Sequence, residues 1–327
     1  MKKPRSMAIG IDVGATKIAA ALVSTNGIVH AARQEKTRCD EGVQAVIDQI
    51  VRLVNDLAGS LSEDLDRTQI SLLGVGIGTP GQVNSKDGIV RDAVNLGWGE
   101  VYLVNELQSR LENELPVLIE TDTNASTLGE FTFGAARRCQ DFVYMSIGSG
   151  LGAGLIINGR LILGSTWKAA ELGHISLDPN GIPCVCGLRG CVETIVSGPG
   201  MLNLVTRYIS QGKYPTRLSA KSEITTTAVV SAGLEEDDLA RAVFSEMGCY
   251  LGTIISFCAA LINPNLIVIG GGLGLAAFDL IIPTVWQEIK RRTMSSVYSE
   301  LKIVPSQQVS SAIGAACMVF SHNLGDA

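Results

Sequence analysis

The sequence has no excess of positive charge and no long uninterrupted hydrophobic run. Its net charge is -6, so it offers no general cationic surface for the phosphates of a nucleic acid. The longest apolar stretch, 251–262, contains Gly, Thr and Ser and is too short to span a bilayer. No apolar segment with a small-residue cleavage site follows the basic N-terminal residues, which argues against a secretory signal. We therefore expect a cytoplasmic protein that binds neither nucleic acid nor membranes.

Cysteine is too sparse for a disulfide scaffold, since the chain of 327 residues contains eight. Five of these are scattered among apolar or helical surroundings, where we interpret them as small core residues. The other three, Cys184, Cys186 and Cys191, are clustered and need a separate explanation. The hydrophobic content of 46% indicates a globular protein, and the length allows two domains.

The hydrophobic pattern predicts two similar α/β halves. Each half opens with strands joined by tight turns and continues into helices. The predicted strands are 7–12, 18–23, 28–32, 72–77 and 117–119 in the first half, and 142–147, 155–157, 161–163 and 266–269 in the second. The predicted helices are one from residue 42, then 104–115, 125–131, 202–209, 239–261, 280–289 and one after 310. We expect a ligand cleft between the halves.

Three glycine-rich segments follow predicted strands, at 12–17, 148–154 and 270–272. Glycine lets backbone N–H groups approach a phosphate, but strand ends often use glycine simply to turn, so one segment alone is weak evidence of a site. Three in one chain favour nucleotide binding. No Walker motif occurs. The segment at 148–154 leads into another strand instead of a helix, which disfavours a nicotinamide-dependent oxidoreductase.

Two aspartates accompany these segments. Asp12 ends a predicted strand beside the first glycine turn, where it suits either a Mg²⁺ site or a cap for the turn. Asp122 lies at the start of a predicted helix, where it suits either a helix cap or a general base. The sequence leaves both pairs of alternatives open.

His174 and the three clustered cysteines supply one imidazole and three thiolates, which is a complete tetrahedral ligand set for zinc. Gly187 and Gly190 let the chain turn back so that Cys191 can reach the same ion. Because protein groups fill all four positions, we predict a structural zinc ion instead of a catalytic one.

These motifs resemble those of the ROK family of sugar kinases and repressors, within the hexokinase, actin and chaperone-ATPase superfamily. The similar segments are 12–17, 76–81, 95–98, Asp122, and 171–174 followed by 184–193. The resemblance implies an α/β protein of two actin-like (ribonuclease H-like) ATPase domains with an interdomain cleft. It also implies ATP, Mg²⁺ and structural Zn²⁺, and a homodimer. We place the domains at 1–122 and 123–308, with a C-terminal helix in 309–327 that packs on the first domain.

The resemblance also implies roles for individual residues. Asp122 would be the catalytic base. The residues implied around the sugar are Gly78, Pro80, Gly81, Asn95, Thr121, Glu171, His174 and Glu193. The residues implied at ATP and its phosphates are Asp12, Gly14, Ala15, Thr16, Lys17, Gly148, Ser149, Gly150, Gly152, Gly270, Gly271 and Gly272. The chain departs from the family at Thr121, where relatives often have Asn, and at Ala15, where glycine is usual.

The favoured function is phosphorylation of a glucose-like hexose at its 6-hydroxyl. Alternatives within the family are kinases of N-acetylmannosamine, N-acetylglucosamine or fructose, with ATP or polyphosphate as donor. A different class is the non-catalytic sugar-sensing regulator. Family repressors carry an N-terminal helix-turn-helix, and only six residues precede the first predicted strand here, so DNA binding is disfavoured.

Overall fold

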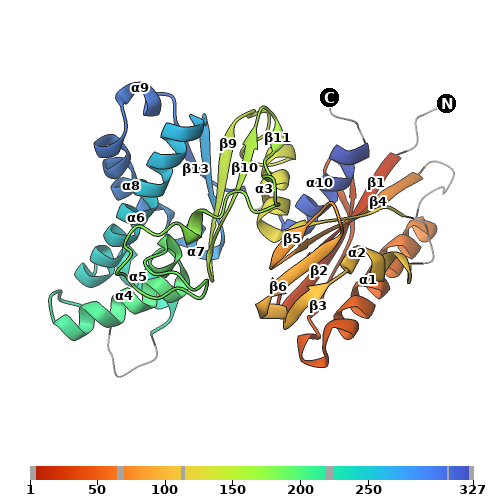
Figure 1. The fold of residues 1–327 in the computed structure, drawn as a ribbon, viewed down its shortest axis with the longest axis horizontal. Helices are drawn as coiled ribbons and strands as arrows, with labels where there is room; N and C mark the ends of the chain where they lie inside the picture. Colours follow the sequence, from red (N-terminus) through yellow and green to blue (C-terminus); the bar gives the residue numbers. More distant parts are fainter. Residues whose placement is uncertain (1–4, 65–69, 112–114, 219–223, 308, 324–327) are drawn as a thin grey trace. The chain divides into compact units, whose positions relative to one another are not determined.

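The computed structural model describes residues 5–64, 70–111, 115–218, 224–307 and 309–323, which form two compact units (Figure 1). Unit 1 contains the described residues of Met1–Arg138, Leu163–Ala169 and Gln307–Ala327, and unit 2 contains those of Cys139–Ile162 and Ala170–Ser306. Each unit has its own hydrophobic core, so each is described by itself.

Unit 1 is built on a five-stranded sheet in the order β3-β2-β1-β4-β8. Its strands are β1 (Arg5–Val13), β2 (Lys17–Ser24), β3 (Val29–Lys36), β4 (Ile70–Thr79) and β8 (Val117–Thr121). The first three pair antiparallel, whereas β4 and β8 run parallel to β1. Ile9 and Ile11 are fully buried in one core with helix α1 (Val43–Asp64), as the helical spacing of its apolar residues predicted.

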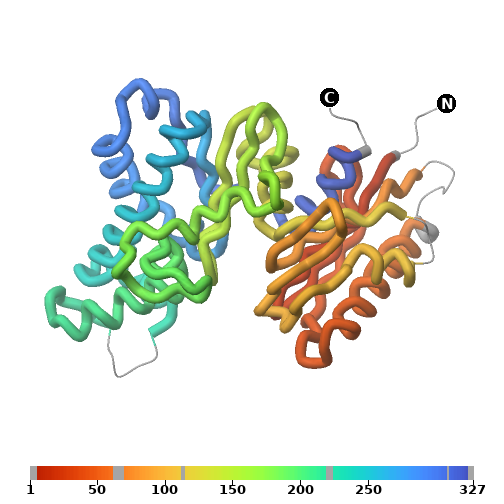
Figure 2. The backbone as a smooth tube through the Cα atoms, in the orientation of Figure 1, coloured from red at the N-terminus to blue at the C-terminus, as the bar shows by residue number. Residues whose placement is uncertain are grey.

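The opposite face of this sheet is covered by α3 (Asp122–Thr132) and α10 (Ser311–Asn323). Side chains alternate across a strand, so residue 10 faces away from Ile9 and Ile11. It is glycine because a Cβ at Gly10 would overlap the carbonyl oxygen of Ala312 in α10. Figure 2 shows α10 in blue beside the red β1. Because α3 packs on α10, the first unit extends to Arg138, beyond the boundary at 122 expected from the sequence.

Unit 1 also contains a small antiparallel sheet that the sequence analysis did not predict. Its strands are β5 (Gln82–Asn84), β6 (Ile89–Ala93) and β7 (Trp98–Val101). The helix predicted at 104–115 was predicted too long, since helix α2 covers Leu103–Gln108. The amide of Arg110 bonds the carbonyl of Leu107, which closes the last turn, and 112–114 lie outside the described residues.

Unit 2 repeats the plan of the first sheet in the order β11-β10-β9-β12-β13. Its strands are β9 (Phe142–Ile147), β10 (Leu151–Ile157), β11 (Arg160–Leu161), β12 (Leu266–Gly270) and β13 (Lys302–Pro305). Three strands again pair antiparallel, and the last two run parallel to the first of them. The predicted duplication of an α/β plan is confirmed by this topology.

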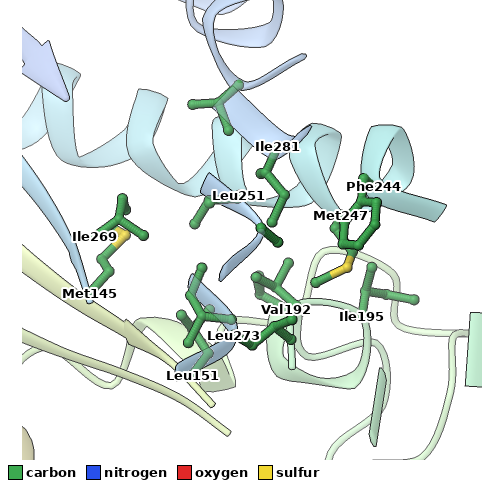
Figure 3. Close-up of a cluster of buried hydrophobic side chains, with 14 of the residues drawn as sticks. Met145, Leu151, Val192, Ile195, Phe244, Met247, Leu251, Ile269, Leu273 and Ile281 are labelled. Atoms are coloured by element: carbon green, nitrogen blue, oxygen red, sulfur yellow. The ribbon is translucent and has the colours of Figure 1, made fainter. Parts of the chain in front are cut away.

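The helices of unit 2 are α4 (Gly198–Gln211), α5 (Thr226–Leu234), α6 (Asp238–Ile262), α7 (Gly272–Ala276), α8 (Phe278–Arg292) and α9 (Ser295–Tyr298). In the described part of the chain, α6 is the one helix long and apolar enough to cross a membrane, and 56% of its most apolar window is buried inside the protein. Figure 3 shows Leu251 of α6 in a core with Leu151, Val192 and Leu273. That core therefore holds Leu151, Val192 and Leu273 in place, and each of these residues is next in the chain to a predicted site residue.

Candidate functional site

The carboxyl ends of three parallel strands bring acidic residues together in unit 1. The pairing register places Asp12 beside Gly78, and Gly78 beside Glu120. In α/β sheets this edge is where ligands bind. Gly78 is buried, and a Cβ there would lie 3.2 Å from the Cβ of Ala125 and 3.4 Å from the Cα of Asp122. The absent side chain therefore lets the start of α3 approach the strand edge.

Asp122 begins α3, but it is not the helix cap. Thr121 is the cap, and its hydroxyl accepts a 3.1 Å hydrogen bond from the amide of Asn124. Asp122 Oδ1 accepts from the amide of Thr123 at 2.7 Å and from its hydroxyl at 3.2 Å, and within the described residues no hydrogen bond uses Oδ2. The carboxylate is accessible to solvent, yet crowding by surrounding protein raises its pKa, and the Thr123 donors oppose that shift.

Asp12 is half-buried and lies near Asp122. Burial raises the pKa of Asp12 to about 6, and repulsion from Asp122 adds to the rise, whereas Lys17 and the hydroxyl of Ser311 oppose it. Hard carboxylate oxygens that repel each other form a site that a divalent cation stabilises. The residues present at this edge therefore fit Mg²⁺.

Glu120 is a buried acid to which the sequence analysis gave no role. It is 6% exposed, and its Oε2 accepts from the amide Nδ2 of Asn124 at 2.9 Å and from the backbone N of Thr121 at 3.3 Å. Burial raises its pKa. Glu120 thereby ties the end of β8 to the first turn of α3 and fixes the backbone on both sides of Asp122.

The first glycine hairpin joins β1 to β2. The amide of Gly14 donates to the carbonyl of Lys17 at 2.9 Å, which closes a tight turn. Thr16 and Lys17 are exposed at its tip. The methyl group of Ala15 packs against the core of unit 1, so this side chain points inward and not toward the tip of the turn.

The other residues predicted on the sugar side of unit 1 lie in turns around the small sheet. Gly81 has φ +99°, and a Cβ there would lie 2.7 Å from the carbonyl oxygen of Arg91, which requires glycine. Pro80 is half-buried. Asn95 is exposed in a 3₁₀ turn (Val94–Leu96) that ends at Gly97 in the left-handed region. These turns offer an amide side chain and backbone groups to a polar ligand.

Unit 2 contains a cavity of about 520 Å³, within the usual range for a small-molecule site. The starts of α4, α5 and α7 and the tip of the hairpin between β9 and β10 surround it. The residues that line it are Gly148, Ser149, Gly198, Pro199, Leu202, Thr226, Thr227, Val230, Ser231, Gly272, Leu273 and Ala276. Backbone N–H groups at helix starts attract anions, and the apolar side chains suit a flat ring.

The cavity includes only some of the glycines that were predicted to bind nucleotide. Gly148 and Gly272 line it. A Cβ at Gly270 would overlap the Tyr144 hydroxyl, and one at Gly271, which has φ +78°, would overlap the carbonyl oxygen of Ile147, so packing against β9 requires both glycines. Gly152 pairs with Ser146 inside the sheet, and neither Gly152 nor Gly150 is among the lining residues.

The cavity walls contributed by α4 and α5 were not predicted from the sequence. Both helices begin at hydroxyl caps, because Ser197 accepts from the amide of Gly200 at 3.0 Å and Thr225 accepts from that of Ala228 at 3.2 Å. Ser197 followed by Gly and Pro is a recognisable helix start. These capping signals were available in the sequence, but only the fold shows that the two helix starts meet.

The predicted metal ligands come together in unit 2. The ligand atoms of His174, Cys184, Cys186 and Cys191 all lie within 4.8 Å of one another. Cys184 Sγ is 3.7 Å from His174 Nδ1, and Cys186 Sγ is 3.6 Å from Cys191 Sγ. Metal–ligand bonds of about 2.0–2.3 Å in a tetrahedron separate neighbouring ligand atoms by roughly 3.5–3.8 Å. The four side chains therefore fit one zinc ion.

Two glutamates flank this cluster. Glu193 follows the cluster by two residues in a 3₁₀ turn (Val192–Thr194), and its Oε2 accepts from the amide of Leu151 at 2.9 Å. A Cβ at Gly150 would overlap the same oxygen. Glu193 therefore connects the metal cluster to the second glycine hairpin. Glu171 is exposed just before the 3₁₀ turn that contains His174, where its carboxylate is available to a ligand.

Comparison with known proteins identifies the relatives of this chain. A family model described as ROK family matches residues 8–322. A glucokinase from Halalkalibacterium halodurans is 31% identical over 84% of this chain and 83% of that protein. A xylose repressor from Caldicellulosiruptor bescii is 29% identical over 95% of this chain and 76% of that protein.

Among solved structures, a ROK family glucokinase from Streptomyces griseus in complex with glucose and AMPPNP superposes with a TM-score of 0.76. The two sequences are 27% identical. The match covers 95% of this chain and 98% of the glucokinase chain. The predicted α/β fold with actin-like ATPase topology is confirmed by such neighbours. The family model and the sequence relatives together show that the chain belongs to the ROK family.

Proposed function

We propose that the protein is an ATP-dependent sugar kinase that transfers the γ-phosphoryl group to a hexose hydroxyl. The favoured substrate is glucose, phosphorylated at its 6-hydroxyl, because a relative that is 31% identical in sequence is a glucokinase. The observation that carries the proposal is the state of Asp122. Its carboxylate is accessible, leaves the capping of α3 to Thr121, and lies beside Asp12 at the ligand-binding edge of the sheet.

In the proposed reaction Asp122 accepts the proton of the attacking sugar hydroxyl. The sugar oxygen forms a bond to the γ-phosphorus while the bond from that phosphorus to the β,γ-bridging oxygen breaks, which releases ADP. Gly78, Pro80, Gly81, Asn95 and Thr121 in unit 1 would hold the sugar hydroxyls. Glu171, His174 and Glu193 in unit 2 would do the same, because carboxylates, imidazoles and amides pair with hydroxyl donors and acceptors.

The nucleotide would use groups from both units. The cavity of unit 2 has an apolar wall for the adenine ring and helix starts for the phosphates. Gly148, Ser149 and Gly272, which line this cavity, would lie nearest the nucleotide, with Gly150, Gly152, Gly270 and Gly271 shaping the backbone. In unit 1, Gly14, Ala15, Thr16 and Lys17 would bind phosphate oxygens. Asp12 would hold Mg²⁺, which when bound neutralises phosphate charge.

The cysteine and histidine cluster would bind Zn²⁺ as a structural ion, since all four positions are filled by protein groups. The ion would fix the ring of His174 and the turn that carries Glu193. The resemblance further favours a homodimer in the cytoplasm, without nucleic acid or membrane partners.

A substitution of Asp122 by Asn tests the proposal. This change removes the base but keeps an acceptor for the Thr123 amide, so the fold should persist while kcat falls about 10³-fold or more. Sugar-dependent ADP release measures the rate, and Asp40→Asn, at an exposed position of the same unit, is the matched control. A variant with near-normal kcat would refute the assignment of Asp122 as base.

A second candidate is a non-catalytic sugar-sensing regulator, which the similarity to the xylose repressor favours. The discriminating measurement is ADP release by the wild-type protein with glucose, mannose, N-acetylmannosamine, N-acetylglucosamine and fructose, and with polyphosphate in place of ATP. A kinase turns over at least one of these pairs. Sugar binding by calorimetry without any turnover would instead support the regulator.

A further inference from the structure

The hairpin 14–17 is held from behind by residues 37–39, which follow strand β3. The hydroxyl of Thr37 donates to the carbonyl of Gly14 at 2.6 Å, and the backbone amide of Thr37 donates to the carbonyl of Thr16 at 3.2 Å. The thiol of Cys39 donates to the carbonyl of Ala15 at 3.3 Å. Three consecutive carbonyl groups of the hairpin thus each accept a hydrogen bond from the same short segment.

These bonds determine the direction of the hairpin amides. In a planar trans peptide the C=O of one residue and the N–H of the next point in opposite directions. The carbonyls of Gly14 and Ala15 point toward 37–39, so the amides of Ala15 and Thr16 point away from it. Within the described residues neither amide donates a hydrogen bond. Adjacent unpaired amides of this kind form an anion-binding nest.

The reverse orientation of these peptides would be unfavourable on both sides of the hairpin. It would direct a carbonyl oxygen at a bound anion, which repels it. It would also leave the Thr37 hydroxyl without its acceptor, and Thr37 is only 3% exposed, so water cannot readily replace that bond. The segment therefore favours one of two orientations that glycine at residue 14 would otherwise allow.

We propose that Thr37, assisted by Cys39, is a positioning residue that orients the amides of Ala15 and Thr16 toward the phosphates of the nucleotide. This proposal rests on the proposed kinase function and adds to it two residues that do not touch substrate. Thr37 acts through the peptide planes of the hairpin, whereas the predicted phosphate-binding residues act directly.

The test compares Thr37→Val, which keeps the shape and removes the hydroxyl, with Thr37→Ser, which keeps the hydroxyl. The valine variant should lower kcat/KM for MgATP about tenfold or more, while the KM for the sugar changes less than about twofold. The serine variant should stay within about threefold of wild type. Cys39→Ala should have a smaller effect, about threefold, because a thiol is a weak donor. Binding of Mg-AMPPNP by calorimetry and the melting temperature complete the comparison.

Unchanged kinetics in Thr37→Val would overturn the proposal, and so would equal losses in both Thr37 variants accompanied by equal drops in melting temperature. A wild-type protein without sugar-dependent ATP turnover would refute the proposed kinase function instead. In that case Mg-AMPPNP binding decides. Binding by wild type that weakens in Thr37→Val but not in Thr37→Ser supports the positioning role, whereas equal binding, or none by wild type, overturns it.

Discussion

The two units share one sheet plan, but they hold the hairpin between their first two strands by different means. In unit 1 the connecting residues 14–16 are held by neutral donors from residues 37–39. In unit 2 the connecting residues 148–150 adjoin a carboxylate, because Glu193 accepts from the amide of Leu151. The amide of Gly198 at the start of α4 also donates to the carbonyl of Gly148 at 2.8 Å.

This difference shows which properties belong to the duplicated scaffold and which to the individual site. The strand order fixes where each hairpin emerges, because each lies between antiparallel strands at the edge of a buried core. The chemistry around each hairpin is set by residues that the two sheets do not share. Unit 1 adds the acids Asp12 and Asp122, whereas unit 2 adds the cavity and the metal cluster. One plan thus supports an acidic edge and a largely apolar pocket.

The largest contrast between the units should appear when the metal cluster is removed, because unit 1 has no counterpart among its described residues. Cys186→Ser alters the exposed ligand and should abolish zinc binding, lower the melting temperature, and weaken sugar binding about tenfold or more through Glu193. Elemental analysis, calorimetry and sugar titration measure these effects. Cys249→Ser, outside the cluster in the same unit, should retain the metal. Purified wild-type protein without zinc would refute the ligand assignment.

Substitutions in the two hairpins should have kinetic effects of different size. Gly150→Ala places a methyl group where the Glu193 carboxylate lies, so it should displace that carboxylate from the hairpin and lower kcat/KM for MgATP roughly tenfold. Ala15→Gly removes a methyl group that packs on the core of unit 1 and should cost only about 1 kcal/mol of stability, with little kinetic change. Steady-state kinetics and urea unfolding test both. Equal kinetic losses would contradict the separate bracing of the hairpins.

The last predicted effect concerns the pH dependence of stability in unit 1. The pKa of Asp12 is raised from 3.8 to about 6, so between these values the folded protein binds more protons than the unfolded chain. Stability therefore decreases as the pH rises through this window. Asp12→Asn removes the unfavourable charge and should stabilise the protein at pH 7.5 by about 1–2 kcal/mol, an advantage that disappears near pH 4.

Thermal unfolding across pH measures this effect, with Asp40→Asn as a control that should not change the profile. An Asp12→Asn variant no more stable than wild type at pH 7.5 would contradict the repulsion inferred at the strand edge.

The sequence was most informative where the site is local in the chain. The metal ligands at 184–191 are close enough in sequence that residue type and spacing predicted their meeting. The glycine hairpins were predictable for the same reason. The residue that caps α3 was not predictable, because Thr and Asp are both good helix caps. Only the hydrogen bond from the amide of Asn124 to the hydroxyl of Thr121 shows that Thr121 is the cap and Asp122 is not.

Features formed by segments that are distant in the chain were not predicted. The cavity joins residues near 148, 198, 226 and 272, which no local pattern connects. The small sheet β5-β6-β7 was missed because its strands are short, although Asp87 and Gly88 between β5 and β6 are a turn signal. Gly270 and Gly271 were predicted to bind nucleotide, but what the structure shows at both is close packing against β9.

The close fit of α10 against the glycine face of β1 has a consequence for synthesis on the ribosome. Residues 5–138 emerge long before 311–323, so until α10 is synthesised this face of the unit 1 sheet is covered by α3 alone. Unit 2 is nearly continuous in the chain and can complete its core first. The half that is translated first is therefore expected to be the half that finishes folding last, and nascent chains paused before α10 should depend most on chaperones.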